Sequence, residues 1–105
     1  MVERHALRIS AHYRALIDPD DPASWSGKLR PDTRAVYTEA MTNPLLEIAD
    51  LATIAAAPRS GLLAVDNTFA TPMLQRPFEH GADLVVHSMT KFLNGHADVV
   101  AGIIV

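Results

Sequence analysis

Lys91 and the residues around it carry the clearest chemical potential in this 105-residue chain. Lys91 is one of two lysines, and it follows the apolar run of residues 84–86 and the hydroxyl side chains of Ser88 and Thr90. A short run rich in Val predicts a buried strand, so Lys91 is expected where this strand gives way to a loop. Burial of a lysine there disfavours its ammonium form and frees the amine as a nucleophile, with hydroxyls suited to phosphate nearby. The same pattern also fits a loop lysine beside two solvated hydroxyls.

A second candidate side chain, Asp66, closes another apolar run at residues 62–65. The carboxyl ends of parallel strands meet at one edge of a sheet, so Asp66 and Lys91 are expected to face one crevice. A carboxylate at the end of a buried strand is costly unless it is paired. Backbone N–H groups of its own turn would satisfy it, and so would a cationic ring nitrogen bound in the crevice.

Pyridoxal phosphate (PLP) is a cofactor that uses this set of side chains. A lysine forms a Schiff base with it, an aspartate keeps the pyridine nitrogen protonated, and hydroxyls with a helix N-terminus hold the phosphate. A metal site is not expected, because no pair of histidines has the His-x-His or His-x-x-x-His spacing that brings two ligands together. The residues considered for a metal are His80, Asp83, His87, His96 and Asp98.

Several other polar and aromatic residues are expected to have structural roles. His96 is predicted to tie down the turn at residues 94–95, and His87 to lie in the core with backbone partners. Tyr37 and Trp25 are predicted to be core residues rather than platforms for a ligand.

The elements that would position these side chains alternate between strands and helices. Strands are predicted at residues 12–18, 35–39, 62–65, 84–88 and 99–105, and helices at residues 22–29 and 45–57. Asp21 is the predicted N-cap of the first helix, while residues 72–80 show little regular pattern. This order predicts an α/β fold with a mostly parallel sheet. The last strand is expected to be antiparallel, because the connection before it is short and has little helical signal.

Composition excludes several functional classes. The net charge of −3 argues against a nucleic-acid-binding surface. The absence of cysteine excludes a disulfide framework and a cysteine nucleophile. No apolar run reaches the roughly 20 residues that span a bilayer, and no signal peptide is recognised, so we expect a cytoplasmic protein without membrane contacts. The apolar last strand and the small number of helices predict that residues 1–105 form one partial domain.

Three segments of the chain resemble the PLP-dependent enzymes of Cys/Met metabolism. They are residues 36–44 (VYTEAMTNP), 65–72 (VDNTFATP) and 81–96 (GADLVVHSMTKFLNGH). The family includes cystathionine γ-synthase, cystathionine γ-lyase, O-acylhomoserine sulfhydrylase and methionine γ-lyase, and the similarity runs from about residue 13 to residue 105. The resemblance implies the fold type I of PLP-dependent transferases, with an aspartate-aminotransferase-like large domain. It also implies a homotetramer and a small amino-acid substrate.

The resemblance implies roles for five residues. Lys91 is similar to the lysine that forms the Schiff base and shuttles protons, and Asp66 to the partner of the pyridine nitrogen. Ser88 and Thr90 are similar to phosphate ligands, and Asn43 to an asparagine near the phenolic oxygen and the substrate. The chain departs from the family at residues 40–41, where Ala-Met replaces the usual Ser/Thr-Pro.

The resemblance covers only the central part of the family's length. The glycine-rich phosphate loop, the ring-stacking tyrosine, the N-terminal arm and the C-terminal domain have no match. The implied function is γ-replacement or β/γ-elimination on cystathionine or O-acylhomoserine-type amino acids. A catalytically inactive remnant that packs with other chains or binds PLP weakly is the alternative. Another PLP enzyme, such as a desulfurase, is disfavoured by the second and third segments.

Overall fold

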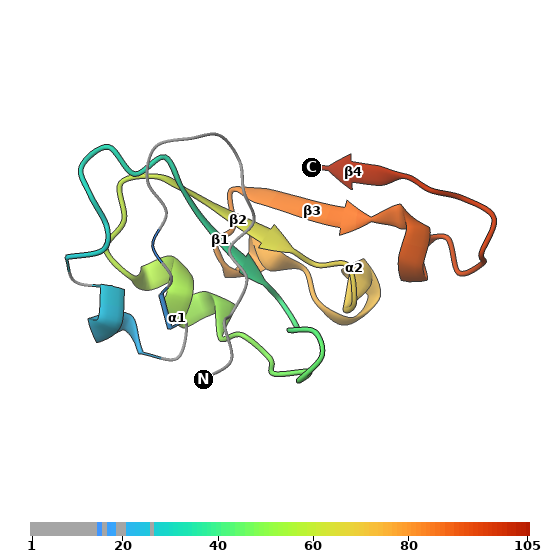
Figure 1. The fold of residues 1–105 in the computed structure, drawn as a ribbon, viewed down its shortest axis with the longest axis horizontal. Helices are drawn as coiled ribbons and strands as arrows, with labels where there is room; N and C mark the ends of the chain where they lie inside the picture. The colour runs from blue at the N-terminus through green and yellow to red at the C-terminus, as the bar shows by residue number, and fades with distance from the viewer. Residues whose placement is uncertain (1–14, 16, 19–20, 26) are drawn as a thin grey trace.

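A four-stranded sheet organises the computed structural model, which describes residues 15, 17–18, 21–25 and 27–105 (Figure 1). The strands lie side by side in chain order: β1 (Ala35–Glu39), β2 (Leu62–Asp66), β3 (Leu84–Ser88) and β4 (Gly102–Ile104). β1, β2 and β3 are parallel, and β4 is antiparallel to β3. The α/β class and the antiparallel last strand are therefore confirmed. The strand predicted at residues 12–18 falls mostly outside the described part of the chain.

Short helices connect the parallel strands. α1 (Leu51–Ala56) lies between β1 and β2, and α2 (Thr71–Leu74) and a 3₁₀ helix (Pro77–His80) lie between β2 and β3. The prediction that residues 72–80 lack regular structure is wrong, because prolines at the start of both helices suit the unpaired first turn. In the part of the chain that the structure describes, no helix is long and apolar enough to cross a membrane.

The core lies on the face of the sheet that α1 covers. Side chains alternate along a strand, so Val36, Leu63 and Val65 all point to this face, where Leu51 and Ile54 of α1 meet them. Each of these five side chains is at most 4% exposed. Trp25 joins the same cluster as predicted, and its indole N–H donates to the carbonyl of Asp18 at 2.7 Å.

α1 is shorter than the helix predicted at residues 45–57. Asp50 starts it, because the Asp50 carboxylate accepts a hydrogen bond from the backbone N–H of Thr53 at 3.0 Å. The residues before Asp50 form a turn closed by an isolated β-bridge between Met41 and Ile48, and Leu46 has a positive φ of 57°. The apolar spacing of this segment therefore reflects a turn rather than the first part of a helix.

The helix predicted at residues 22–29 is a single 3₁₀ turn, Pro22–Trp25. Asp21 caps it as predicted, since its Oδ1 accepts from the backbone N–H of Ala23 at 3.1 Å. Gly27 follows with a φ of +74°, a left-handed conformation in which the helix does not continue.

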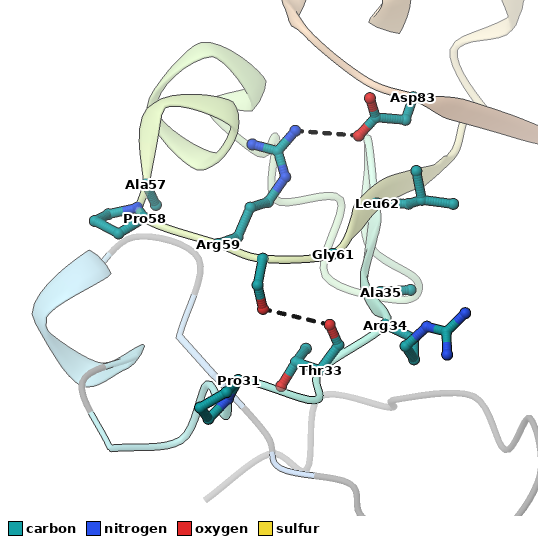
Figure 2. Close-up of a pocket in the computed structure, with 11 residues that line it drawn as sticks. Pro31, Thr33, Arg34, Ala35, Ala57, Pro58, Arg59, Gly61, Leu62 and Asp83 are labelled. Carbon is teal, nitrogen blue, oxygen red and sulfur yellow. Dashed lines mark hydrogen bonds and ion pairs between the residues drawn. The ribbon is translucent and has the colours of Figure 1, made fainter.

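The amino-terminal ends of β2 and β3 are joined through Asp83. Its Oδ2 accepts a hydrogen bond from the backbone N–H of Leu63 at 2.7 Å and lies 3.1 Å from Nη2 of Arg59 (Figure 2). The Leu63 hydrogen bond, followed by the bond from Arg59, lowers the pKa of Asp83 below its ordinary value. Asp83 is thus a structural anchor, with no other metal-ligating side chains clustered around it among the described residues.

A side chain at Gly61 would clash with the backbone at the start of β1. A Cβ there would lie 2.5 Å from the carbonyl carbon of Arg34 and 2.8 Å from the backbone N of Ala35, where β1 begins. We expect Gly61→Ala to lower the free energy of unfolding by about 1–3 kcal/mol, the usual cost of overpacking. Urea unfolding followed by circular dichroism measures the change.

Gly102→Ala is the matched control for this prediction. A Cβ at Gly102 meets its nearest atom, the carbonyl oxygen of His87, at an ordinary 3.5 Å. Equal unfolding free energies for the two variants would contradict the close approach of β1 and β2.

Candidate active site

The candidate active site lies at the carboxyl edge of the three parallel strands, which point the same way in Figure 1. β1 ends at Glu39, β2 at Asp66 and β3 at Ser88. In the register, Glu39 is the partner of Asp66, and Asp66 is the partner of Val86. The sheet therefore brings Asp66 and Ser88, which are 22 residues apart in the sequence, to the same edge.

Both oxygens of the Asp66 carboxylate accept a hydrogen bond. The hydroxyl of Tyr37 donates to Oδ2 at 2.9 Å, and the backbone N–H of Thr68 donates to Oδ1 at 2.9 Å. The backbone partner is the kind of turn contact that the sequence suggested as one way to satisfy Asp66. The second partner comes from the neighbouring strand, 29 residues earlier in the chain.

Tyr37 was missed by sequence reasoning, which assigned it to the core. It lies on the face of the sheet opposite the buried Val36 and is partly exposed. The alternation of residues 35–39 is the signal that could have placed it there, because it puts Tyr37 and Asp66 on one face. Burial, followed by the charge of Asp66, raises the pKa of Tyr37 above its ordinary value. The hydroxyl therefore stays protonated and remains a donor.

Thr68 links this pair to β3. Its Oγ1 accepts a hydrogen bond from the backbone N–H of Ser88 at 2.8 Å, and its own N–H holds Asp66. Tyr37, Asp66, Thr68 and Ser88 thus form one chain of hydrogen bonds across the carboxyl ends of β1, β2 and β3.

Thr90 is attached to the strand that follows the site. Its hydroxyl donates to the carbonyl of Ala101 at 3.2 Å and accepts from the N–H of Ala101 at 3.0 Å. A hydroxyl has one proton to donate, so Thr90 would bind a phosphate oxygen only by giving up the Ala101 carbonyl. In this structure Thr90 ties the turn around Lys91 to the chain just before β4.

Lys91 lies in a tight turn, Met89–Leu93, directly after β3. Its backbone dihedrals (φ −97°, ψ −126°) break the helical path of this turn. Of the two alternatives that the sequence left open for Lys91, the structure agrees with the exposed loop lysine and not with the buried one. Lys91 is exposed, and its neighbours Phe92 and Leu93 are themselves 65% and 41% exposed. Its role at the carboxyl edge stays a prediction.

Asn43 is carried by the turn that follows β1. Its peptide bond to Pro44 is cis, and the turn is closed by the backbone N–H of Glu47, which donates to Oγ1 of Thr42 at 3.0 Å. Asn43 is exposed. Its role in the site stays a prediction.

The histidines separate into two kinds. His87 is buried as predicted, but its Nδ1 has no hydrogen-bond partner among the described residues. His96 lies against its turn as predicted, since its Nδ1 is 3.4 Å from the Asn94 carbonyl oxygen, and Asn94 Nδ2 also donates to the His96 carbonyl at 2.8 Å. No group of three or more His, Asp or Glu side chains gathers as a metal site in the described part of the chain.

The cavity in Figure 2 is not the candidate site. It opens at the amino-terminal ends of β1 and β2, where Pro31, Ser60 and Gly61 line it. Of its three charged side chains, Arg59 and Asp83 are paired with each other, and Arg34 is exposed at the start of β1. Asp66, Ser88 and Lys91 lie at the opposite edge of the sheet.

The site residues fit a cofactor with a protonated pyridine ring. Two carboxylate oxygens offer about four acceptor positions, and the structure fills two of those of Asp66 with the Tyr37 and Thr68 donors. A ring N–H is a suitable third donor for the remaining negative charge. The exposed Lys91 amine follows the adjacent strand.

The fold and this site define the class of protein: an α/β protein with a candidate ligand site at the carboxyl edge of a parallel sheet. The family described as Cys/Met metabolism PLP-dependent enzyme matches residues 2–105 of the chain. The chain belongs to this family, whose cofactor is PLP, as the resemblance in its sequence implied.

Curated relatives carry several activities of sulfur amino-acid metabolism. The chain is 56% identical over 84 residues to an L-methionine gamma-lyase of Streptomyces avermitilis, covering 80% of this chain and 20% of the relative. It is 48% identical over 99 residues to a cystathionine gamma-synthase/O-acetylhomoserine (thiol)-lyase of Bacillus subtilis, covering 92% and 26%. The chain thus spans about a fifth to a quarter of the length of these relatives.

Solved structures of the same group share the fold. A cystathionine gamma-lyase from Lactobacillus plantarum, complexed with L-serine, matches with a TM-score of 0.80 and 43% identity, covering 87% of this chain and 24% of that one. A putative O-acetylhomoserine (thiol)-lyase from Campylobacter jejuni matches with a TM-score of 0.78 and 36% identity over 83% and 21% of the two chains. That structure contains a pyridoxyl-lysine monophosphate. The predicted aspartate-aminotransferase-like fold of PLP-dependent enzymes is confirmed.

The raised pKa of Tyr37 predicts how stability depends on alkaline pH. A folded-state pKa above the ordinary value of 10.0 means that the native protein holds this proton more tightly than the unfolded chain. The stabilisation is complete below pH 10 and is lost as the pH rises above it. We expect the unfolding free energy of the wild type, relative to that of Tyr37→Phe, to be the same at pH 8 and pH 9 and to fall as the pH rises from about 10 to about 12.

Urea unfolding of the two proteins at each pH measures this difference. A gap between wild type and Tyr37→Phe that stays constant across the range would show that the Tyr37 hydroxyl titrates normally.

Proposed function

We propose that this chain supplies the lysine and the ring-nitrogen partner of the PLP site of an enzyme that acts on sulfur amino acids. The reaction is γ-replacement or β/γ-elimination on cystathionine or an O-acylhomoserine-type substrate. The observation that supports this most is the Asp66 carboxylate, held on both oxygens one strand away from the turn that carries Lys91.

PLP, when bound, supplies an electron sink for the substrate's α-carbon. Asp66 holds the proton of the ring nitrogen, and its negative charge favours the cationic ring. Lys91 would attach the cofactor and move protons between carbons of the substrate from the turn directly after β3. Ser88 orients the phosphate from the end of β3, and Asn43 contacts the substrate from the turn after β1.

Thr90 joins the phosphate site only when its hydroxyl exchanges partners. In the structure the Thr90 hydroxyl donates its proton to the Ala101 carbonyl. Phosphate binding by Thr90 would break this hydrogen bond and loosen the segment just before β4. The proposal therefore gives Thr90 two roles: it anchors the turn in the free protein and contacts phosphate in the loaded one.

Several large apolar side chains of the described residues are exposed to solvent. Met73, Leu74 and Val100 are 88%, 80% and 94% exposed, and burial of such side chains is favourable. We propose that further chain or other subunits of a homotetramer cover them. A small amino acid is the proposed substrate, in keeping with the activities for which the relatives are named.

Borohydride reduction in the presence of PLP tests the central part of this function. Reduction converts a lysine-bound cofactor into a stable pyridoxyl-lysine, which peptide mass mapping locates. We expect the label on Lys91 and not on Lys28, the second lysine of the chain and a built-in control for non-specific reaction. Lys91→Arg should remove the label, and Lys28→Arg should leave it unchanged.

Equal labelling of both lysines, or none, would contradict the proposed function. It would favour the second candidate, a catalytically inactive remnant that packs with other chains. The exposure of Lys91 gives that candidate its support, because an unburied amine has no special reactivity.

A further inference from the structure

The partners of Asp66 differ in how firmly they hold it. Thr68 donates from Asp66's own turn, two residues along the chain, and contacts only Oδ1. A carboxylate held at one oxygen can still turn about its Cβ–Cγ bond, because this torsion is broad. The Tyr37 hydroxyl contacts Oδ2 from a different strand. The two contacts together fix the plane of the carboxylate.

The register of β1 and β2 accounts for the hydrogen bond between Tyr37 and Asp66. Tyr37 is the β-partner of Ala64, and Glu39 is the partner of Asp66, so the tyrosine meets the carboxylate diagonally across two strands. The pairs Tyr37/Ala64 and Glu39/Asp66 lie on the sheet face opposite the core. A long aromatic side chain spans this diagonal, and its position is set by the backbone of β1.

Charge explains why the partner is a phenol. A lysine or arginine at residue 37 would neutralise Asp66, whereas a neutral hydroxyl orients the carboxylate and leaves its charge available. The nearby carboxylates Asp66 and Glu39 both oppose ionisation of Tyr37, which keeps it a hydrogen-bond donor. Asp66 thus retains its negative charge for a cationic ligand at this edge.

We propose that Tyr37 is a positioning residue for the cofactor ring: it fixes the plane of the Asp66 carboxylate so that an unused lone pair faces the pyridine nitrogen. This inference rests on the proposed function, because it requires PLP to bind beside Asp66. It adds a residue whose hydroxyl acts through Asp66 and does not touch the reacting atoms.

A double-mutant cycle on PLP affinity tests the inference. Affinity is measured by absorbance titration of four proteins: wild type, Tyr37→Phe, Asp66→Asn and the double variant. We expect Tyr37→Phe to weaken binding about tenfold, the effect of losing one hydrogen bond to a charged group. In the Asp66→Asn background the same change should have little effect, because the two residues act as a unit.

Thr38→Val is the matched control. It removes a hydroxyl from the same strand, one that donates to the carbonyl of Glu39 at 3.2 Å and not to Asp66. PLP affinity should be unchanged in this variant. A tenfold loss in both backgrounds, or an equal loss in Thr38→Val, would assign Tyr37 a purely structural role and overturn the inference.

The outcomes separate this inference from the function on which it rests. A wild-type chain that shows no selective borohydride label on Lys91 contradicts the proposed function itself. A labelled wild type with unchanged affinity in Tyr37→Phe overturns only the role of Tyr37.

Fluorine NMR provides a second measurement if Tyr37→Phe does not fold. The chain has two tyrosines, Tyr13 and Tyr37, and 3-fluorotyrosine retains the hydroxyl at both. We expect the Tyr37 resonance, assigned with a Tyr13→Phe protein, to shift when PLP is added to the wild type and to stay in place in Asp66→Asn. No shift in the wild type would contradict coupling between Tyr37 and the cofactor.

Discussion

A carboxylate at the end of a buried strand must be paired, and the pairing of Asp66 organises the carboxyl edge of this sheet. The Tyr37 hydroxyl and the Thr68 N–H each hold one oxygen, and the Thr68 hydroxyl in turn holds the N–H of Ser88. Three strands are thereby tied together at the edge where a ligand is expected. A change in any of these contacts would alter both the end of the sheet and the orientation of the carboxylate.

Asp66 and Lys91, the two halves of the candidate site, are held in place by different contacts. Asp66 and its partners belong to strands whose inner face is packed on α1, so their positions follow from the core. Lys91 lies in a turn that Thr90 joins to the segment before β4, and it is exposed. A cofactor bound by both would bridge a carboxylate held on two oxygens and an exposed amine.

The sequence predicted the parts of the fold that depend on local pattern. The apolar runs that lead to Asp66 and Ser88 are strands as predicted, since burial on the pleated sheet favours them. The helix at residues 45–57 was predicted too long, because apolar spacing does not reveal the bridge between Met41 and Ile48. The helix begins instead after Asp50, whose carboxylate caps it.

The site was only partly predictable, because its contacts join residues that are far apart in the sequence. Residue pattern and family resemblance predicted roles for Asp66 and Lys91. The contact between Tyr37 and Asp66 was not predicted, because it joins residues 29 positions apart and depends on strand register. The exposure of Lys91 was also not predictable from its neighbours Phe92 and Leu93. Apolar neighbours in sequence bury a side chain only when the fold turns them towards it.

The protonation state of the cofactor ring is the most direct test that Asp66 is the residue around which the site is built. Nitrogen-15 NMR of PLP labelled at the pyridine nitrogen, bound to the protein at neutral pH, measures it. We predict a protonated ring nitrogen in the wild type and an unprotonated one in Asp66→Asn. A ring nitrogen that is unprotonated in the wild type, or unaffected by Asp66→Asn, would contradict the account.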